Sequence, residues 1–219
     1  MSAPTIAAQV DEFNTGFTAQ IGPDLSAVFA AEQDALTAAG IPAGVVRVGD
    51  ELAPATLLTP TGDEVVLADV LGGEAAVVVF YRGAWCPYCN LTLRTYQQEL
   101  LPLLSERGVK LVAISPQTPE GSEQALANGE LEFTVLSDPS NKLSRALGIV
   151  TEPTADARAA HTQLGFDVAD SNADATGDIP FPTVLVVNAD GRVSFVDIHV
   201  DYTTRTEVPA IVAAVDAAL

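Results

Sequence analysis

A continuously apolar run followed closely by two cysteines constrains the fold more than any other feature of the sequence. Residues 77–81 are all apolar, which predicts a β-strand buried on both faces. Cys86-Pro87-Tyr88-Cys89 follows this run and precedes a predicted helix at residues 91–107, in which Pro102 should introduce a kink. A second buried strand is predicted at residues 109–114. The cysteine pair should therefore lie at the carboxyl end of a central strand, where open α/β sheets carry their chemistry.

The rest of the chain predicts an α/β fold on a mixed β-sheet flanked by helices. Hairpins are predicted at residues 55–67, around Thr61-Gly62-Asp63, and at residues 184–200, around Asn188-Ala189-Asp190-Gly191. A further strand is predicted at residues 133–137, and helices at residues 119–128, 141–147, 153–164 and 206–219. The Asp-rich stretch 166–179 predicts a solvated loop, with a calcium-binding loop as the alternative.

The first forty-four residues predict a helical extension. Apolar residues spaced by three or four positions share one helical face: Ile6, Val10, Phe13 and Phe17. Gly22-Pro23 should break this helix before a second one that ends near Gly40. We expect residues 1–44 to pack on a main domain of residues 45–219, with a homodimer contact as the alternative role.

Charge and hydropathy exclude several classes of function. The chain has 10 basic and 29 acidic residues and a formal net charge of −19. An acidic surface disfavours nucleic acid and anionic membranes as partners. No apolar run approaches the roughly 18–20 residues of a membrane span, and residues 1–10 lack the features of a secretory signal. We therefore expect a cytoplasmic protein.

The two cysteines of the chain predict redox chemistry. A four-ligand zinc site would need both His161 and His199, which lie far from zinc-finger spacing, so no metal is expected. A structural disulfide across so short a loop would stabilise little and would stay reduced in the cytosol. No phosphate-binding glycine loop is present, so no nucleotide cofactor is expected either.

The start of a helix is a reactive position for a thiol. Cys86 should lie near the helix N-cap, with Pro87 at the first helical position and Cys89 one turn inside. Unpaired backbone N–H groups and the helix dipole favour a thiolate there, which makes Cys86 the more exposed nucleophile. Arg82 could add to this stabilisation or form a surface salt bridge. Two aromatic side chains should form an apolar rim around the sulfurs or simply pack: Trp85 and Tyr88.

Residues 80–90, Phe-Tyr-Arg-Gly-Ala-Trp-Cys-Pro-Tyr-Cys-Asn, resemble the active-site segment of peroxiredoxin-like proteins with a thioredoxin-type Cys-x-x-Cys. These belong to the alkyl hydroperoxide reductase and thiol-specific antioxidant superfamily. Supporting matches occur at residues 48–54, 111–115, 136–138, 146–149, 180–183 and 188–191. The resemblance covers roughly residues 45–219 and implies a thioredoxin-like, peroxiredoxin-type fold.

The resemblance implies that Cys89 is the peroxide-reacting cysteine, and three positions depart from the family pattern. The proline and threonine usually found seven and three residues earlier are Arg82 and Cys86 here, and the pocket arginine matches Pro182. In thioredoxins that last position is a cis-proline facing the dithiol, which predicts a cis bond before Pro182. The implied substrate pocket consists of Arg82, Trp85, Tyr88, Pro182 and Thr183.

We therefore predict a thiol-dependent peroxidase. Cys89 would attack a hydroperoxide, Cys86 would condense with the resulting sulfenic acid, and a thioredoxin-like or other dithiol would reduce the disulfide. The alternative is a disulfide oxidoreductase in which Cys86 attacks and Cys89 resolves. A non-catalytic binding domain with an incidental dithiol is the third hypothesis.

Overall fold

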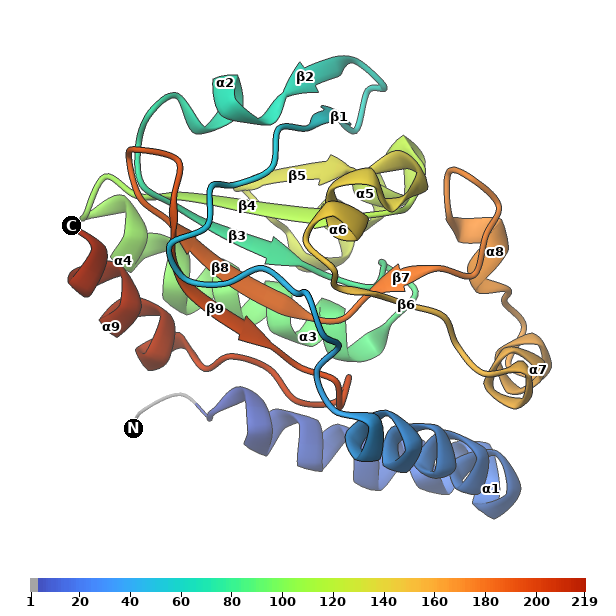
Figure 1. Ribbon diagram of the computed structural model, residues 1–219. Coiled ribbons are helices and arrows are strands. Elements are labelled where there is room, and N and C mark those ends of the chain that lie inside the picture. Colours follow the sequence, from blue (N-terminus) through green and yellow to red (C-terminus); the bar gives the residue numbers. More distant parts are fainter. Residues whose placement is uncertain (1–3) are drawn as a thin grey trace.

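The computed structural model describes residues 4–219 and is built around a seven-stranded mixed β-sheet (Figure 1). The strands lie in the order β2-β1-β5-β4-β3-β8-β9. Their bounds are β1 Thr56–Leu58, β2 Glu64–Val66, β3 Ala76–Phe80, β4 Lys110–Ser115, β5 Thr134–Ser137, β8 Thr183–Val187 and β9 Val193–Ile198. β4 runs parallel to β3 and β5, whereas β8 is antiparallel to β3. The predicted mixed sheet and both hairpins are confirmed.

The centre of the sheet consists of the continuously apolar strands. Every residue of β3 is buried, and so is every residue of β4 after Lys110. Both strands have neighbours on each side and helices over each face, so both sets of alternating side chains are removed from water. At the end of β3, Phe80 is paired with Ile114 of β4 and Thr183 of β8. This pairing brings the start of β8 to the edge where the cysteine loop begins.

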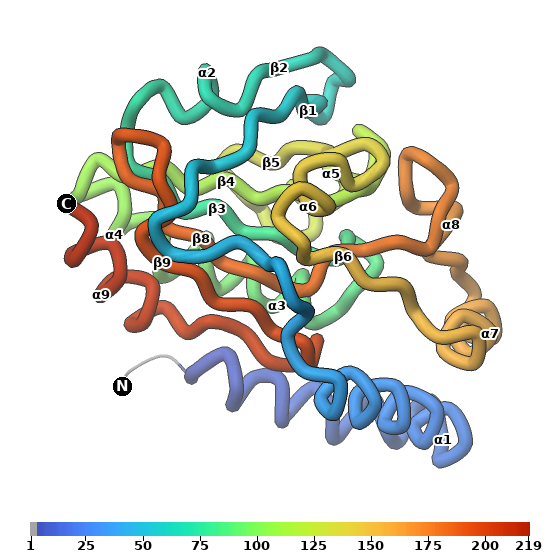
Figure 2. Tube along the Cα trace, viewed as in Figure 1, coloured from blue at the N-terminus to red at the C-terminus, as the bar shows by residue number. Residues whose placement is uncertain are grey.

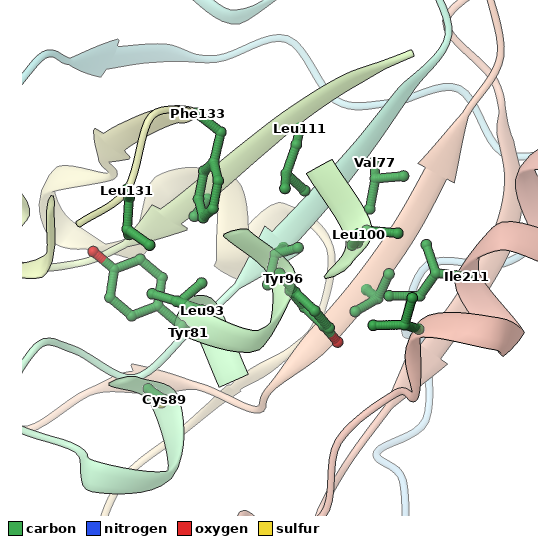
Figure 3. Packing of buried hydrophobic residues seen from close by; sticks show 14 of the residues in the cluster. Val77, Tyr81, Cys89, Leu93, Tyr96, Leu100, Leu111, Leu131, Phe133 and Ile211 are labelled. Atoms are coloured by element: carbon green, nitrogen blue, oxygen red, sulfur yellow. The ribbon is translucent and has the colours of Figure 1, made fainter. Parts of the chain in front are cut away.

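Helices cover both faces of the sheet. The bounds are α2 Leu67–Leu71, α3 Pro87–Thr95, α4 Leu101–Ser105, α5 Pro119–Gly129, α6 Lys142–Ala146, α7 Ala155–Gln163, α8 Val168–Ser171 and α9 Val208–Ala218. One face packs on α3, α4, α5 and α9, where Leu93, Tyr96 and Ile211 meet Val77 of β3 in one core (Figure 3). The other face packs on α2 and α6, through Leu67 and Leu143.

The N-terminal helix α1 (Ile6–Ala39) lies beside the layered domain, against α3 and α7 (Figures 1 and 2). The predicted break is confirmed: Gly22 has φ 81° and ψ 171°, a conformation that favours glycine, and Pro23 follows it. The hydrogen bonds that tie α1 to the domain include Ile6 N to Glu207 Oε2, Thr154 N to Glu32 Oε1 and Tyr88 Oη to Asn14 Oδ1. The division of the chain at residues 44 and 45, and a homodimer contact, stay predictions.

The helix that follows the cysteines is interrupted earlier than predicted. Between α3 and α4, residues Tyr96–Leu100 form a π-helical turn, labelled η1. Pro102 comes just after this turn, and its missing N–H cannot complete the helical hydrogen-bond ladder. The irregular turn brings the fully buried Tyr96 hydroxyl to the carbonyl of Thr206, at 2.6 Å.

The prediction of a solvated loop at residues 166–179 is correct for only part of the segment, in which Asp167 and Asp170 are exposed. The segment contains the short helix α8 and ends in β7 (Ile179–Pro180), which pairs with β6 (Val150–Thr151). Asn172 is buried, and its Nδ2 donates to the carbonyls of Thr176 and Asp178. An asparagine that satisfies the backbone of its own loop holds the segment in place despite its polar composition. No helix within residues 4–219 is both long and apolar enough to cross a membrane.

Candidate active site

The cysteine pair follows the carboxyl end of β3 and opens α3, as predicted. Cys86 is the N-cap of α3 and Pro87 is its first residue. The connecting loop is held by Gln117, whose Oε1 accepts a 2.6 Å hydrogen bond from Ala84 N. Asn90 Nδ2 donates to the carbonyl of the same alanine at 2.7 Å. These two side chains fix the loop from either side, so the sulfurs are presented on a rigid turn.

The loop requires glycine at position 83. Gly83 has φ +153°, and a Cβ atom there would lie 2.7 Å from Trp85 Cδ1 and 3.0 Å from Gln117 Cδ. Neither neighbour can withdraw easily, because Trp85 packs in an aromatic cluster and Gln117 is buried. The absence of a side chain at Gly83 therefore allows Trp85 to fold back beside the cysteines.

Cys89 contacts an arginine that the sequence analysis did not identify. Arg205 Nη2 donates a hydrogen bond to Cys89 Sγ at 3.2 Å. The guanidinium is held by the carbonyls of Tyr202 and Thr204, which accept from its Nη1. Arg205 lies in the segment between β9 and α9, far from the cysteines in sequence. Only its place among the chain's ten basic residues could have marked it as a candidate.

Arg82 is a second buried cation at the site. Its side chain is only 4% exposed, and its guanidinium carbon lies 4.0 Å from the ring centre of Tyr202 and 4.9 Å from that of Trp85. Within the described part of the chain it forms no salt bridge with a carboxylate. A buried cation without a counter-charge is costly, so the arrangement favours a negative charge nearby. The cysteine pair supplies it.

The two thiols have opposite shifts in pKa. Burial raises the pKa of Cys89, but a hydrogen bond from Cys86 and the charges of Arg205 and Arg82 outweigh it, and the pKa of Cys89 lies well below its ordinary value. Burial raises the pKa of Cys86 well above its ordinary value, and its hydrogen bond to Cys89 adds to this. The site therefore holds one proton on Cys86 and a thiolate at Cys89.

The prediction, from the helix end alone, that Cys86 is the more exposed thiol is wrong. Both cysteines are buried, with exposed fractions of 0% for Cys86 and 1% for Cys89. The helix N-terminus does lie at Cys86, as expected, but two guanidinium groups near Cys89 decide where the charge is held. A full cation within hydrogen-bond distance outweighs the partial charge of a helix end.

A cavity of about 380 Å³ lies beside the dithiol. Three of the predicted pocket residues line it, Arg82, Trp85 and Tyr88, together with the sulfur-bearing residue Cys86. The rest of the wall comes from α1, from the segment around α7, and from two further residues: Phe13, Phe17, Gln20, Ile21, Phe29, Gln33, His161, Leu164 and Phe166, with Pro87 and Tyr202. Cys89 is not among the lining residues, so the cavity reaches the dithiol from the side of Cys86.

An aromatic cluster forms part of the wall of this cavity. His161 lies 4.7 Å from Phe166, 5.2 Å from Phe29 and 5.6 Å from Trp85, measured between ring centres. Burial, with the charge of Arg82, lowers the pKa of His161 from 6.5 to about 4. The imidazole is therefore neutral at physiological pH and acts as one more ring of the wall.

Pro182 and Thr183 lie on the Cys89 side of the dithiol and do not line the large cavity. They surround a much smaller space, about 10 Å³, together with Cys89 and Arg205. The peptide bond before Pro182 is trans, because residues 4–219 contain no cis peptide bond, so the predicted cis-proline is wrong. The Pro182 carbonyl accepts from His199 N at 2.9 Å in the hairpin ladder with β9, which holds the start of β8 in regular strand pairing.

No metal centre was predicted, and the described residues contain no group of three or more His, Cys, Asp or Glu side chains that could hold a metal ion.

Comparison with known proteins agrees with this geometry. The model of the AhpC/TSA family matches residues 48–196. The chain belongs to the AhpC/TSA family. It is 32% identical to a putative peroxiredoxin bcp of Haemophilus influenzae over 107 residues, which are 48% of this chain and 66% of the relative. It is also 32% identical to an alkyl hydroperoxide reductase C of Amphibacillus xylanus over 95 residues, 42% of this chain and 50% of that protein. The matched parts thus span about half to two thirds of these relatives.

Solved structures show the same fold at low sequence identity. Reduced Prx3 of Vibrio vulnificus in complex with hydrogen peroxide superposes with a TM-score of 0.63 at 18% identity, over 78% of this chain and 99% of that one. A peroxiredoxin-like protein of Aquifex aeolicus gives 0.61 at 17% identity, over 80% and 89% of the two chains. The thioredoxin-like fold of peroxiredoxins predicted for this AhpC/TSA chain is therefore confirmed.

Two parts of the candidate site lie outside the segment that the family model matches. The family match ends at residue 196, before Arg205, and begins at residue 48, after α1. The cation at Cys89 and one wall of the cavity therefore come from parts of the chain outside that match.

Proposed function

We propose that this AhpC/TSA protein is a thiol peroxidase that reduces hydroperoxides through a Cys86–Cys89 dithiol/disulfide cycle. The observation that carries the proposal is the contact between Arg205 Nη2 and Cys89 Sγ, with Arg82 as a second buried cation. A thiolate is the form of cysteine that attacks a peroxide, and these groups keep Cys89 in that form.

In the first step, the Cys89 thiolate attacks one oxygen of the hydroperoxide and the O–O bond breaks. The sulfur loses two electrons and becomes a sulfenic acid, while the other oxygen leaves as an alkoxide. Cys86 holds its proton tightly, since its pKa is raised, and this thiol hydrogen-bonds to Cys89. It can give that proton to the alkoxide, which leaves as an alcohol.

In the second step, the Cys86 thiolate formed by this transfer attacks the sulfenic sulfur. A disulfide forms and hydroxide leaves, which takes a proton to become water. An external dithiol then reduces the disulfide, and a thioredoxin-like reductant suits this chemistry. Attack of the reductant on Cys86 would release Cys89, whose low pKa makes it the better leaving group. The cycle suits a reducing compartment such as the cytoplasm.

One observation favours a second candidate, a disulfide oxidoreductase in which Cys86 attacks. Cys86 lines the large cavity and Cys89 does not. A substrate disulfide approaching through the cavity would therefore meet Cys86 first, and Cys89 would resolve the mixed disulfide. This reaction needs Cys86 as a thiolate, which its raised pKa disfavours.

Single cysteine variants separate the two functions. In Cys86→Ser, treatment with hydroperoxide should leave a sulfenic acid on Cys89 that a dimedone-type probe traps, located by peptide mass spectrometry. The reduced wild type, as control, should show a Cys86–Cys89 disulfide by intact mass and no trapped sulfenic acid.

The oxidoreductase reaction predicts the opposite result. Cys86→Ser would show no trapped sulfenic acid at Cys89, whereas Cys89→Ser would accumulate mixed disulfides with a substrate disulfide through Cys86. That pair of results would refute the peroxidase and support the second candidate.

A further inference from the structure

The guanidinium of Arg205 is held by the loop that carries it. Its Nη1 donates to the carbonyls of Tyr202 and Thr204, and its Nη2 donates to Cys89 Sγ at 3.2 Å. Both carbonyls belong to the segment between β9 and α9, as Arg205 itself does. The distance between the cation and the sulfur therefore depends on how firmly this segment is attached to the sheet.

The imidazole of His199 connects this segment to the end of β9. Its Nδ1 lies 2.7 Å from Thr204 Oγ1, and its Nε2 lies 3.2 Å from Thr206 Oγ1. Thr204 and Thr206 are the two neighbours of Arg205 in the sequence. One ring thus contacts the residue on each side of Arg205, and these contacts fix the backbone from which the arginine side chain departs.

The ring of His199 is itself anchored on the sheet. Its Nε2 lies 3.1 Å from Asp197 Oδ2, and the same carboxylate oxygen accepts from Thr206 Oγ1 at 2.8 Å. Asp197 belongs to β9 and is paired with Val184 of β8, and His199 N donates to the Pro182 carbonyl at 2.9 Å. The His199 side chain is only 16% exposed, so water competes little for these hydrogen bonds. The contacts of the ring with both threonines therefore start from a fixed point.

We propose that His199 is a positioning residue, which holds both neighbours of Arg205 against β9 and so keeps the guanidinium in contact with Cys89 Sγ. As a role in catalysis, the inference rests on the proposed peroxidase function. Within residues 4–219 no hydrogen bond joins His199 to either cysteine, so the imidazole acts through Arg205. A hydrogen bond weakens steeply as its distance and angle depart from the optimum, so a looser segment would stabilise the thiolate less.

The test is a double-mutant cycle on the pKa of Cys89, measured from the pH dependence of alkylation by iodoacetamide in a Cys86→Ser background. With Arg205 present, His199→Ala should raise the pKa of Cys89 by about one unit, less than removal of the guanidinium itself should. In an Arg205→Met background, His199→Ala should raise it no further, because no guanidinium is left to position. An equal shift in both backgrounds would mean that His199 acts on Cys89 without Arg205, and it would overturn the proposal.

Two milder variants decide the question if His199→Ala does not fold. Thr204→Val removes the hydroxyl that Nδ1 contacts, at an exposed position that tolerates the change. His199→Asn keeps an amide near the place of Nδ1 and loses the contacts of Nε2. Each variant should raise the pKa of Cys89 by less than His199→Ala, and the absence of a shift in both would refute the positioning role.

Ser194→Ala is the matched control. Ser194 also lies on β9, but its Oγ donates to the Val186 carbonyl of β8 at 3.1 Å and not to the segment that carries Arg205. Its removal should leave the pKa of Cys89 unchanged. A shift as large as that of Thr204→Val would show that any lost hydrogen bond of β9 has this effect, against a specific role of His199.

Oxidation by hydrogen peroxide and by tert-butyl hydroperoxide, followed by stopped-flow, separates this inference from the peroxidase function. Below the shifted pKa, His199→Ala should be oxidised about tenfold more slowly than wild type, in step with its thiolate fraction. If wild type is oxidised at Cys89 but none of the His199 and Thr204 variants shifts the pKa, the positioning role is refuted and the peroxidase function stands. If the pKa shifts as expected but neither hydroperoxide oxidises Cys89, the peroxidase function fails and only the structural link from His199 to Arg205 remains.

Discussion

Replacing Arg205 by methionine should raise the pKa of Cys89 by about two units. Methionine keeps much of the side-chain volume but removes the cation whose Nη2 lies 3.2 Å from Cys89 Sγ. At that distance, two unit charges attract by about 5 kcal/mol for an effective dielectric constant of about 20. Desolvation of the guanidinium offsets part of this attraction. The remaining net contribution should be that of a hydrogen bond to a charged group, about 1.5–3 kcal/mol. A net loss of about 2–3 kcal/mol corresponds to about two pKa units.

The measurement is the pH dependence of Cys89 alkylation by iodoacetamide. It is made in a Cys86→Ser background, so that a single thiol reacts and the serine hydroxyl still donates to Cys89. At a pH midway between the Cys89 pKa values of the two proteins, Cys89 should be alkylated about tenfold more slowly in Arg205→Met, since only the thiolate reacts. Arg205→Lys should recover part of the effect, because lysine restores the charge without the planar fork.

Arg107→Met is the matched control. Arg107 forms a salt bridge with Asp216 on the surface, at 2.7 Å, far from the cysteines in the fold, and its loss should leave the pKa of Cys89 unchanged. An unchanged Cys89 pKa in Arg205→Met, or an equal shift in Arg107→Met, would refute the assignment of the thiolate to this contact.

Two further predictions concern the surroundings of the site. Burial lowers the pKa of His161 from 6.5 to about 4. Between about pH 6.5 and pH 4 this histidine is therefore protonated in the unfolded chain and neutral in the folded protein, so the free energy of unfolding decreases as the pH falls through this window. Urea unfolding should show wild type losing about 2–3 kcal/mol more than His161→Phe over this window, and parallel losses in the two proteins would contradict it. Gly83→Ala should cost about 1–3 kcal/mol and shift the fluorescence of Trp85, because the new Cβ would overlap that indole. Gly16→Ala, inside α1 with nothing within 4 Å, should leave the fluorescence of Trp85 unchanged and should not lower stability, since alanine favours a helix. An equal loss of stability in the two alanine variants would refute the clash.

The local pattern of the sequence determined the main elements of this protein. The apolar runs gave β3 and β4, since a strand buried on both faces must be apolar at every position. Pro87 just inside a helix start predicted the place of α3, because its fixed φ and missing N–H suit the first helical position. Gly22-Pro23 predicted the break in α1, again through backbone chemistry alone.

Local pattern failed where a long-range contact overrides it. Asp-rich composition predicted a solvated loop at residues 166–179, but Ala173 N donates to the Pro116 carbonyl and Asn141 Nδ2 donates to the Asp178 carbonyl, which holds the loop against distant segments. The thioredoxin analogy predicted a cis bond before Pro182, but that bond is trans. The contacts of the loop at residues 166–179 depend on which segments meet in the fold.

The position of the negative charge in the dithiol also depends on long-range contacts. The spacing of Cys86 and Cys89 predicts that the two sulfurs meet, because three residues are close to one helical turn. Which of them holds the negative charge depends on Arg205, which arrives from beyond β9, and on Arg82, which only the fold buries. Electrostatic attraction acts through space and is strong only where water is excluded, so the physical cause of a thiolate at Cys89, the residue that the family resemblance implied as peroxide-reacting, lies in the tertiary structure.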